Sequence, residues 1–464
     1  MTRSFPAHDD QPIAALATPP GTSAVAIIRM SGSDVLQRLL PLLQRPDGFR
    51  ASLEDFKPRQ LKRMDVTDET THAPLDQALV VYFPAPHSYT GEDVIELQGH
   101  GSPVVVQRIL ELLSGVGIRP AMPGEFTRRA CLNGKMDLTQ AEAVVSLINA
   151  SSLRSAREAV RQIEGSLSIQ ITNASDRLLT ILAHLEANLD FSDEDLSPLP
   201  DSGLIREISA VSEMLGALLR QASWGIRLQD GFHLVIVGRP NVGKSSLFNR
   251  MLGRKRAIVS ATPGTTRDCI ESAIEIQGMR ITLLDTAGLR YTAEPVEAEG
   301  IQLTRERLSQ ADGVLLVMDA QQGVTEADLE LLEDIPADQT LLVWNKMDLY
   351  AGSSLSIPVE LPAIRVSSET GAGMEILEDH IAKLLLPMSV DGEGVVIMVV
   401  RQKEALLRAV QSLAECEAWM IHGKPGELTT MPLRSALDAL GEVIGHVTQE
   451  DLLDRIFSTF CIGK

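Results

Sequence analysis

The stretch GRPNVGKSS, residues 238–246, carries the residue types and spacing of a phosphate-binding loop. It matches the pattern GxxxxGK followed by Ser or Thr, in which successive backbone N–H groups and a helix N-terminus form a cradle for anionic oxygens. In this pattern Lys244 would reach the β- and γ-phosphates of a nucleotide, and the Ser245 hydroxyl would bind Mg²⁺. The apolar run HLVIV precedes the loop and a helical pattern begins near Lys244. This strand–loop–helix context favours a nucleotide site over a glycine-rich turn without a ligand.

Two later stretches would read the base. NKMD (345–348) follows the apolar run LLVW, and the Asp348 carboxylate could accept two hydrogen bonds from guanine N1–H and N2–H₂, which adenine does not offer. VSSETG (366–371) ends another apolar run, where the Ser368 backbone could contact the guanine O6. These stretches indicate guanine recognition.

Two further stretches would sense the terminal phosphate. DTAG (285–288) closes the run ITLLD, which would place Asp285 near the metal and the Gly288 N–H near the γ-phosphate. PGTTRD (263–268) lies between the loop and DTAG, and its Thr266 hydroxyl is the candidate switch ligand of Mg²⁺. Because all the motifs occur in the expected order, they predict a GTPase domain.

The residue after DTAG is the unusual one. Many GTPases place a glutamine there to orient the attacking water, whereas this chain has Leu289, which cannot hydrogen-bond through its side chain. Arg267 and Arg290 are nearby candidates, but a structural role is favoured for both. A monovalent cation could replace an arginine finger, with Asn241 among its ligands, because an amide oxygen is a hard donor. Asn241 could equally be a turn residue.

The surrounding sequence predicts the elements that position these motifs. Short β-like runs such as AVAIIRM and ALVVYF occupy the first part, and helical periodicity begins near Asp137. From Phe232 apolar strands alternate with helices, which predicts βαβ units on a parallel sheet, and helical periodicity returns after residue 395. We therefore expect a multidomain α/β plus α protein, in which a helical domain is interrupted by an inserted α/β domain. The expected domains are residues 1–133, 134–230, 231–388 and 389–464.

Composition limits the possible classes. The 464 residues carry a formal net charge of −20 and only 4% aromatics, which argues against a stacking platform for single-stranded nucleic acid. The four cysteines lack metal-ligand spacing, and no apolar run approaches the 18 residues of a membrane span, so a cytoplasmic protein is expected. Arg154, Arg157 and Arg161 would share one helix face, for which a solvated face is favoured over contact with nucleic acid.

Several runs together carry a resemblance to a known family. They are ATPPG (17–21), TGEDVIELQGHG (90–101), PGEFTRRACLNGKMDLTQAEA (123–143), GRPNVGKSS, PGTTRD, DTAGLR and the tetrapeptide CIGK (461–464). The whole chain resembles the MnmE (TrmE) family of tRNA modification GTPases, which are TrmE-Era-EngA-like, potassium-activated GTPases. Two departures, GTSA (21–24) for the family's GRGG and GHGS (99–102) for GHGG, bear on the shape of the folate pocket.

The resemblance implies a fold and a function. It implies an N-terminal α/β tetrahydrofolate-binding domain that dimerises, a discontinuous helical domain and an inserted Ras-like P-loop GTPase domain. It implies GTP hydrolysis with the FAD-binding partner MnmG, in a heterotetramer that adds a carboxymethylaminomethyl or aminomethyl group to the wobble uridine of tRNA. The implied cofactors are GTP, Mg²⁺, K⁺ and 5-formyl- or methylene-tetrahydrofolate, and the G domains would dimerise transiently across potassium.

The resemblance also implies residue roles. The folate positions are Arg29, Glu96, Lys135 and Lys464. The potassium positions are Asn241, Ser260, Thr262 and Thr265, and those of Mg²⁺ are Ser245 and Thr266. Glu297 matches the glutamate that orients water, and Cys461 the cysteine needed for modification. The full set assigned to GTP is Asn241, Val242, Gly243, Lys244, Ser245, Ser246, Ser260, Thr262, Gly264, Thr265, Thr266, Asp285, Thr286, Ala287, Gly288, Asn345, Lys346, Asp348, Ser367 and Ser368.

Alternatives stay open at this stage. From the residues alone, Arg29 and Lys135 could pair folate carboxylates and Glu96 could accept hydrogen bonds from the ring, but ordinary surface or interface charges are favoured. Cys461 is balanced between a nucleophile and a structural thiol. A ribosome-assembly or translation-type regulatory GTPase is the competing function, and a folate-dependent one-carbon transferase with a regulatory G domain is a third.

Overall fold

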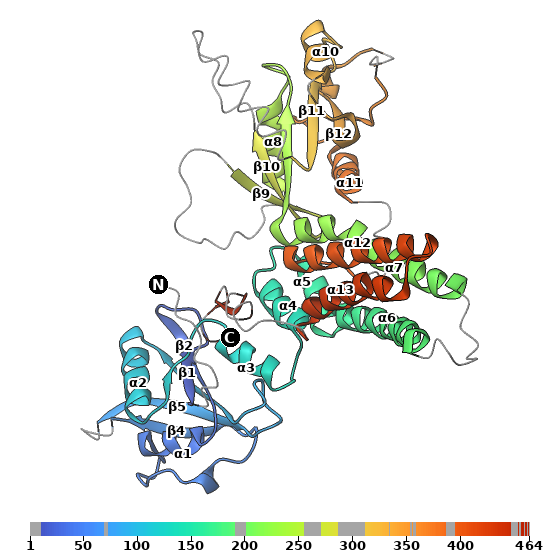
Figure 1. The fold of residues 1–464 in the computed structure, drawn as a ribbon. Helices are drawn as coiled ribbons and strands as arrows, with labels where there is room; N and C mark the ends of the chain where they lie inside the picture. The colour runs from blue at the N-terminus through green and yellow to red at the C-terminus, as the bar shows by residue number, and fades with distance from the viewer. Residues whose placement is uncertain are drawn as a thin grey trace, which may run out of the picture. The chain divides into compact units, whose positions relative to one another are not determined.

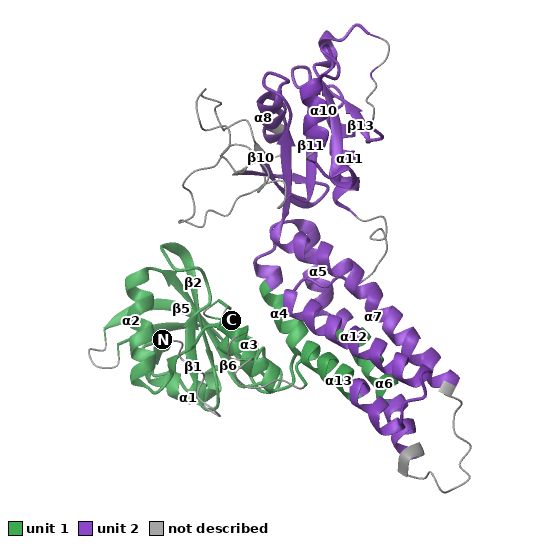
Figure 2. Ribbon diagram, turned by 45° about the horizontal axis from the view of Figure 1, so that its top comes forward, with its two compact units in different colours: residues 1–145, 168–179, 434–464 green, residues 146–167, 180–433 purple. Residues whose placement is uncertain are grey.

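The computed structural model describes most of the chain in two compact units (Figure 2). The described residues are 11–68, 73–190, 201–254, 271–285, 311–333, 335–352, 355, 359–386, 395–446, 453, 456–458, 460, 461 and 463. The first unit comprises residues 1–145, 168–179 and 434–464, and the second comprises residues 146–167 and 180–433. The bounds of the four domains expected from the sequence stay a prediction.

A seven-stranded sheet organises the first unit (Figure 1). Its strand order is β3-β4-β5-β6-β2-β1-β7, and its pairs are antiparallel except β1 with β7. The strands are β1 (Ile13–Leu16), β2 (Ser23–Ser31), β3 (Leu43–Gln44), β4 (Lys62–Thr67), β5 (Pro74–Phe83), β6 (Val94–Gly101) and β7 (Arg119–Pro120). Alternate residues of β2 enter one core, because side chains alternate between the two faces of a strand. Helices α1 (Val35–Leu39) and α2 (Pro103–Gly115) close the same core.

Helices make up much of the rest of the described chain. They are α3 (Glu125–Leu132), α4 (Leu138–Ile148), α5 (Leu153–Ile163), α6 (Ser166–Asp190), α7 (Asp201–Asp230), α12 (Val400–Ile421) and α13 (Gly426–Ile444). Within the second unit α7 packs along α12. Because these two helices precede and follow the strands β8 to β13 in the sequence, the predicted insertion of an α/β part into a helical part is confirmed.

The inserted part contains a six-stranded sheet with the order β13-β12-β11-β8-β10-β9. The strands are β8 (Phe232–Val237), β9 (Glu271–Ile276), β10 (Met279–Asp285), β11 (Gly313–Asp319), β12 (Thr340–Asn345) and β13 (Ala363–Arg365). All pairs are parallel except the β9–β10 hairpin, as the sequence predicts for a mostly parallel sheet. The described helices of this part are α8 (Lys244–Arg254), α10 (Glu326–Glu333) and α11 (Met374–Leu385).

Both faces of this sheet are covered. Leu234 and Ile236 of β8 belong to one apolar core, whereas Val235 and Val237 belong to the core on the other face. A parallel sheet that is buried on both faces needs continuous apolar strands rather than alternating ones. This requirement explains why HLVIV, VLLVM and LLVW are uninterrupted apolar runs, and it leaves the polar ends of these strands to form a site.

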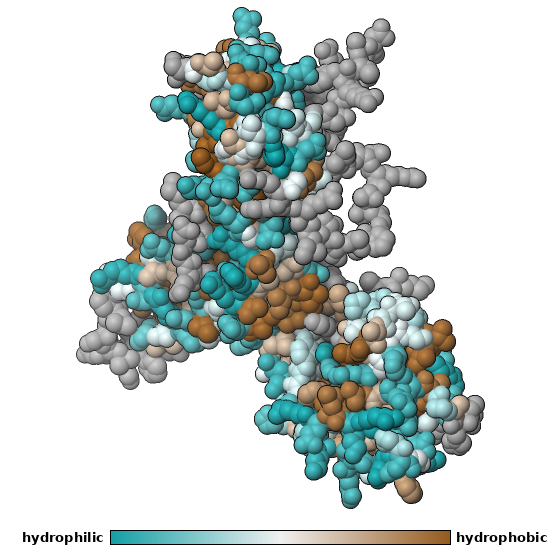
Figure 3. Space-filling view, turned by 180° about the vertical axis from the view of Figure 1, so that it is seen from behind, coloured by the Kyte–Doolittle hydropathy of each residue, from teal (hydrophilic) through white to brown (hydrophobic). Residues whose placement is uncertain are grey.

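The described surface mixes apolar and hydrophilic side chains (Figure 3). Leu153, Ile169 and Ile421 are each more than 60% exposed, which is ordinary for single apolar residues on a folded surface. Among the described helices, none has the length and apolar character needed to cross a membrane.

Candidate nucleotide site and the charged sites of the first unit

The backbone of the predicted phosphate loop has the conformation that its glycines allow. The loop connects β8 to α8, and φ is +148° at Gly238, +65° at Asn241 and +97° at Gly243. A Cβ atom on Gly238 would lie 2.3 Å from the Val317 carbonyl oxygen, and one on Gly243 would lie 2.3 Å from Asn345 Nδ2. Only glycine satisfies both the positive φ and the close approach at these two positions. Asparagine is among the few other residues that tolerate a left-handed conformation.

The P-loop lysine lies within this loop. Lys244 Nζ donates to the carbonyl oxygens of Gly238 at 2.7 Å and Arg239 at 2.8 Å, so its ammonium group sits inside the curve of the backbone. Ser245 and Ser246 follow in the first turn of α8, where both are exposed. The N-terminus of α8, the Lys244 ammonium group and the exposed Ser245 therefore lie at the same loop. A helix N-terminus, a positive charge and a hydroxyl together form the arrangement that binds a phosphate chain.

Arg239 fixes the loop from outside, a role that the motif did not reveal. Its Nε lies 2.8 Å from Oδ1 of Asp328, which is fully buried in α10. The other carboxylate oxygen of Asp328 accepts hydrogen bonds from the backbone N and the hydroxyl of Thr325 at 3.0 and 2.9 Å. Because Asp328 is a buried residue of α10, its ion pair with Arg239 anchors the loop to that helix. No general signal in the sequence identifies this pairing.

Asn345 joins the base-reading stretches to the phosphate loop. Its Nδ2 donates to the Val242 carbonyl at 3.0 Å, and its Oδ1 accepts from the Ser368 backbone N at 3.0 Å and hydroxyl at 2.8 Å. The Asp348 carboxylate accepts a 2.5 Å hydrogen bond from the Ser367 hydroxyl. The motifs NKMD and SSET, separated by about a strand and a loop, therefore meet at the carboxyl end of the parallel sheet, where α/β folds bind ligands.

Lys346 and Arg250 complete these connections. Lys346 Nζ donates to the Asn241 carbonyl at 2.7 Å and to Asp319 Oδ2 at 2.8 Å. Arg250 of α8 donates through Nε to the Ser368 carbonyl at 2.7 Å, and through Nη2 to the Glu369 carbonyl. The helix that begins at the phosphate loop thus also holds the loop that would contact the base.

Part of the predicted site lies outside the described residues. This holds for the residues Ser260, Thr262, Gly264, Thr265, Thr266, Arg267, Thr286, Ala287, Gly288, Leu289, Arg290, Glu297 and Lys464. Asp285 is described only as the last residue of β10. Their proposed roles stay predictions. Within the described ranges, no group of three or more His, Cys, Asp or Glu side chains could hold a metal ion.

The predicted folate residues form a partial cluster in the first unit. Arg29 of β2 is opposite Glu96 of β6, and its Nε and Nη2 lie 3.0 and 2.8 Å from Glu96 Oε1. Arg29 Nη1 also lies 3.5 Å from the Gly463 carbonyl, and its guanidinium lies 5.5 Å from the ring centre of Tyr89. The structure therefore brings Arg29, Glu96 and Gly463 together. Tyr89, next to the TGED run, was not identified from the sequence.

Lys135 has a different neighbour. Its ammonium group donates to the Pro86 carbonyl at 3.0 Å, and its aliphatic stem passes 3.3 Å from the position of a Cβ on Gly91. Because Arg29 is already paired with Glu96, a folate carboxylate would have to share the guanidinium with this glutamate. The geometry therefore gives Arg29 a positioning role toward Glu96 in addition to any contact with a ligand.

A buried charge cluster explains the PGEF and TGED runs. Glu125, only 4% exposed, accepts from Arg119 Nη2 at 2.5 Å and from Arg129 Nη2 at 3.0 Å. Arg129 also lies 3.2 Å from Glu92, which accepts from the Ser31 hydroxyl at 2.8 Å. Burial raises the pKa of Glu125, but the hydrogen bonds from Arg119 and the Met122 backbone N–H, with both arginine charges, outweigh it and lower the pKa overall. These charges neutralise one another, so the cluster is structural.

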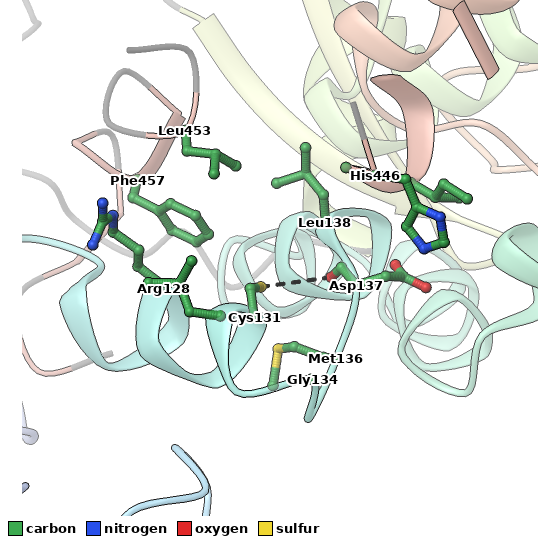
Figure 4. A pocket seen from close by; sticks show the side chains of 12 residues that line it. Arg128, Cys131, Gly134, Met136, Asp137, Leu138, His446, Leu453 and Phe457 are labelled. Carbon is green, nitrogen blue, oxygen red and sulfur yellow. Dashed lines mark hydrogen bonds between the residues drawn. The ribbon is translucent and has the colours of Figure 1, made fainter. Parts of the chain in front are cut away.

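The cysteines of the first unit differ in accessibility. Cys461 is exposed, and its carbonyl accepts from the Gly124 N at 3.3 Å. Cys131 lines a cavity of about 300 Å³ with Met136, Leu138 and Phe457 (Figure 4), and its thiol lies 3.8 Å from the Asp137 carbonyl. Burial raises the pKa of Cys131 to about 12, so its thiol is a poor nucleophile near neutral pH.

The arginine face on α5 is partly used inside the protein. The Arg154 guanidinium lies 5.1 Å from the ring centre of Trp224, and Arg161 lies 3.0 Å from Glu158 on the same helix. A cation held over an aromatic ring contributes to packing. Whether this helix face is only solvated or contacts tRNA stays a prediction.

Comparison with known proteins covers the whole chain. The family model described as "GTP-binding protein TrmE N-terminus" matches residues 12–135, and "MnmE helical domain" matches residues 138–461. A protein of Magnetococcus marinus named "tRNA modification GTPase MnmE" is 46% identical, with 100% of both chains covered. Proteins of the same name from Aquifex aeolicus (41% identical; 98% of this chain and 100% of the relative) and Methylococcus capsulatus (42%; 99% and 100%) agree. The chain therefore belongs to the MnmE family of tRNA modification GTPases.

Proposed function

We propose that this protein binds and hydrolyses GTP as the GTPase component of a complex that modifies the wobble uridine of tRNA. The observation that carries the GTPase part is the joining of three motifs through Asn345, which contacts Val242 of the phosphate loop and Ser368 of the base-reading loop. This places Asp348, the residue that would read guanine, on the same sheet edge as Lys244, which would hold the phosphates.

Magnesium and potassium are proposed as the ions of this site. The Ser245 hydroxyl at the start of α8 and the exposed Asn241 side chain are oxygen donors of the type that these ions prefer. When bound, the ions would neutralise charge that develops on the phosphates during hydrolysis. Lys244 would hold the phosphates, and Glu297 would orient the attacking water in place of the glutamine that Leu289 replaces.

Hydrolysis measured in different salts tests this proposal. GTP turnover should be markedly faster in KCl than in NaCl at the same ionic strength, and Asn241→Ala should lose most of that difference. Equal rates of the wild type in both salts would contradict the potassium role.

Glu297→Ala should lower kcat with little change in nucleotide affinity, whereas a parallel loss of affinity would indicate a folding role instead.

The first unit is proposed to bind a tetrahydrofolate one-carbon donor and to mediate homodimerisation. Support comes from Arg29 and Glu96, whose side chains are only 19% and 17% exposed, and from Tyr89 and Gly463, which lie beside Arg29. An aromatic ring, a carboxylate and a guanidinium can together bind a pterin ring with its hydrogen-bonding edge. Cys461, two residues before Gly463 in the sequence, is exposed and would act in modification.

Isotope tracing tests the folate and partner assignments. Tetrahydrofolate carrying a labelled one-carbon group should transfer the label to tRNA only when MnmG, GTP and this protein are all present. Glu96→Gln should reduce the transfer while leaving GTP hydrolysis by the isolated protein unchanged, because Glu96 belongs to the first unit. Full labelling of tRNA without this protein would contradict the proposal.

A further inference from the structure

Asp319 stands at the end of a central strand, beside the motif that would read guanine. It is the last residue of β11 and is 1% exposed. The parallel register of β11 and β12 pairs it directly with Asn345. A buried carboxylate at the carboxyl edge of such a sheet must be paired or hydrogen-bonded, because burial of an unpaired charge is costly.

The two oxygens of Asp319 have different partners. Oδ1 accepts a 2.9 Å hydrogen bond from the Gln321 backbone N and so closes the turn after the strand. Oδ2 lies 2.8 Å from the ammonium of Lys346. Burial raises the pKa of Asp319, but the hydrogen bonds from Lys346 and from the backbone outweigh it, so its pKa is lowered and the group is a carboxylate at neutral pH.

The backbone conformation of Lys346 allows its side chain to make this contact. Its φ of +61° is left-handed, which is uncommon for a lysine and directs the chain sharply after Asn345. Its ammonium then donates both to Asp319 and, at 2.7 Å, to the Asn241 carbonyl of the phosphate loop. Two lysines therefore donate to the same short loop, since Lys244 donates to the carbonyls of Gly238 and Arg239.

We propose that Asp319 is a positioning residue for the nucleotide. Its carboxylate holds the ammonium group of Lys346, a residue of the guanine-reading segment, against the Asn241 carbonyl of the phosphate loop. The Asp319 carboxylate also neutralises the charge of Lys346, one of the two lysines whose ammonium groups donate to this loop. Without it, Lys346 would gain freedom to leave the loop, and the Asn241 carbonyl would lose its donor. This inference rests on the proposed nucleotide site and adds to it a residue that none of the sequence motifs contains.

A conservative substitution separates the two functions of the carboxylate. In Asp319→Asn, the amide oxygen can still accept from Gln321 N, whereas its NH₂ group would face the Lys346 ammonium, donor against donor. We expect the affinity for a fluorescent GDP analogue to fall about tenfold, the size of effect typical of a lost charge-assisted hydrogen bond. In steady-state hydrolysis the KM for GTP should rise about as much, while kcat at saturating GTP and potassium should change less than about twofold.

A double-mutant cycle tests whether Asp319 acts through Lys346. In a Lys346→Met background, which keeps the length of the side chain but removes its charge, Asp319→Asn should change GDP affinity by less than about twofold. An equal tenfold loss in both backgrounds would overturn the proposal, and so would an unchanged affinity of the single variant Asp319→Asn. Thermal unfolding of each variant shows whether the fold is retained.

Asp312 provides a matched control at the opposite end of β11. It is also a largely buried carboxylate; it lies 2.9 Å from Arg227 and accepts from the His233 backbone N at 2.8 Å. Asp312→Asn should leave GDP affinity unchanged, and a loss equal to that of Asp319→Asn would overturn the proposal by showing a general effect of the strand. If the wild type itself fails to bind GDP, the proposed function fails, whereas normal wild-type binding without coupling in the cycle rejects the role of Asp319 alone.

Discussion

The phosphate loop and the Arg29–Glu96 cluster are constructed in opposite ways. In the second unit the phosphate loop is formed by consecutive backbone groups of residues 238–244, with glycines where the chain turns. In the first unit Arg29 meets Glu96 and Gly463, which are 67 and 434 positions away in the sequence. The phosphate loop is thus a continuous sequence motif. The Arg29 cluster forms only because residues that are distant in the sequence meet in the fold.

This difference determines which substitutions each site tolerates. A backbone site depends on conformations that only some residues adopt, so it is sensitive to an added Cβ atom. A side-chain site depends on complete pairing, so it is sensitive to the loss of one charge, which leaves its partner buried and uncompensated. The predictions below test this contrast.

The largest effect on nucleotide binding is expected for Gly243→Ala. The new Cβ would lie 2.3 Å from Asn345 Nδ2, at a φ of +97° that alanine rarely adopts. The Asn345–Val242 hydrogen bond should break, and GDP affinity should fall at least about a hundredfold from strain and hydrogen-bond loss together. Titration with a fluorescent nucleotide measures this. Gly253→Ala is the control: a Cβ there meets nothing within 4 Å, and the change should leave affinity unchanged.

A different effect, on the stability of the first unit, is expected for Glu125→Ala. Removing this 4% exposed carboxylate leaves Arg119 and Arg129 without it, and breaking such a buried network typically costs about 3–5 kcal/mol. Amide hydrogen exchange of the first unit should accelerate.

Glu111→Ala is the matched control for that variant. Glu111 pairs with Arg108 one helical turn away, with both side chains more than 40% exposed. Exposed pairs of this spacing contribute little to stability, because solvent screens their charges and both side chains lose conformational freedom. If Glu111→Ala accelerated exchange in the first unit as much as Glu125→Ala, the contrast between a buried network and a surface pair would fail.

The smallest effect is a dependence on pH. Because the folded pKa of Glu125 is depressed below its ordinary value of 4.5, its contribution to stability is present above that value and is lost as the pH falls through the lower folded pKa. The difference in hydrogen exchange between the wild type and Glu125→Gln should therefore be constant from pH 7 to about 5 and should shrink in more acidic solution. A difference that grows on acidification would contradict the assigned sign.

Particular residues show how far sequence reasoning could go. The phosphate loop, the order of the G motifs and the inserted parallel sheet were predicted because each depends on local spacing and on continuous apolar strands. Arg239 with Asp328, Lys346 with Asp319, and Arg250 with Ser368 could not be predicted, because nothing in the local sequence marks a pair whose members lie 27 to 118 positions apart. For the same reason, the contact of Tyr89 with Arg29 in the proposed folate cluster could not be predicted.

The sequence by itself determined the family, the strand–loop–helix geometry of the nucleotide site and the residues that could touch phosphate and guanine. These features follow from steric rules and hydrogen-bonding capacity that act over a few residues. Only the tertiary structure decided that Glu125 pairs with two arginines, that Arg29 is held by Glu96, and that Asp319 holds Lys346 against the phosphate loop. Those outcomes depend on which strands become neighbours and in which register, and a buried charge is stable only where that neighbour supplies its partner.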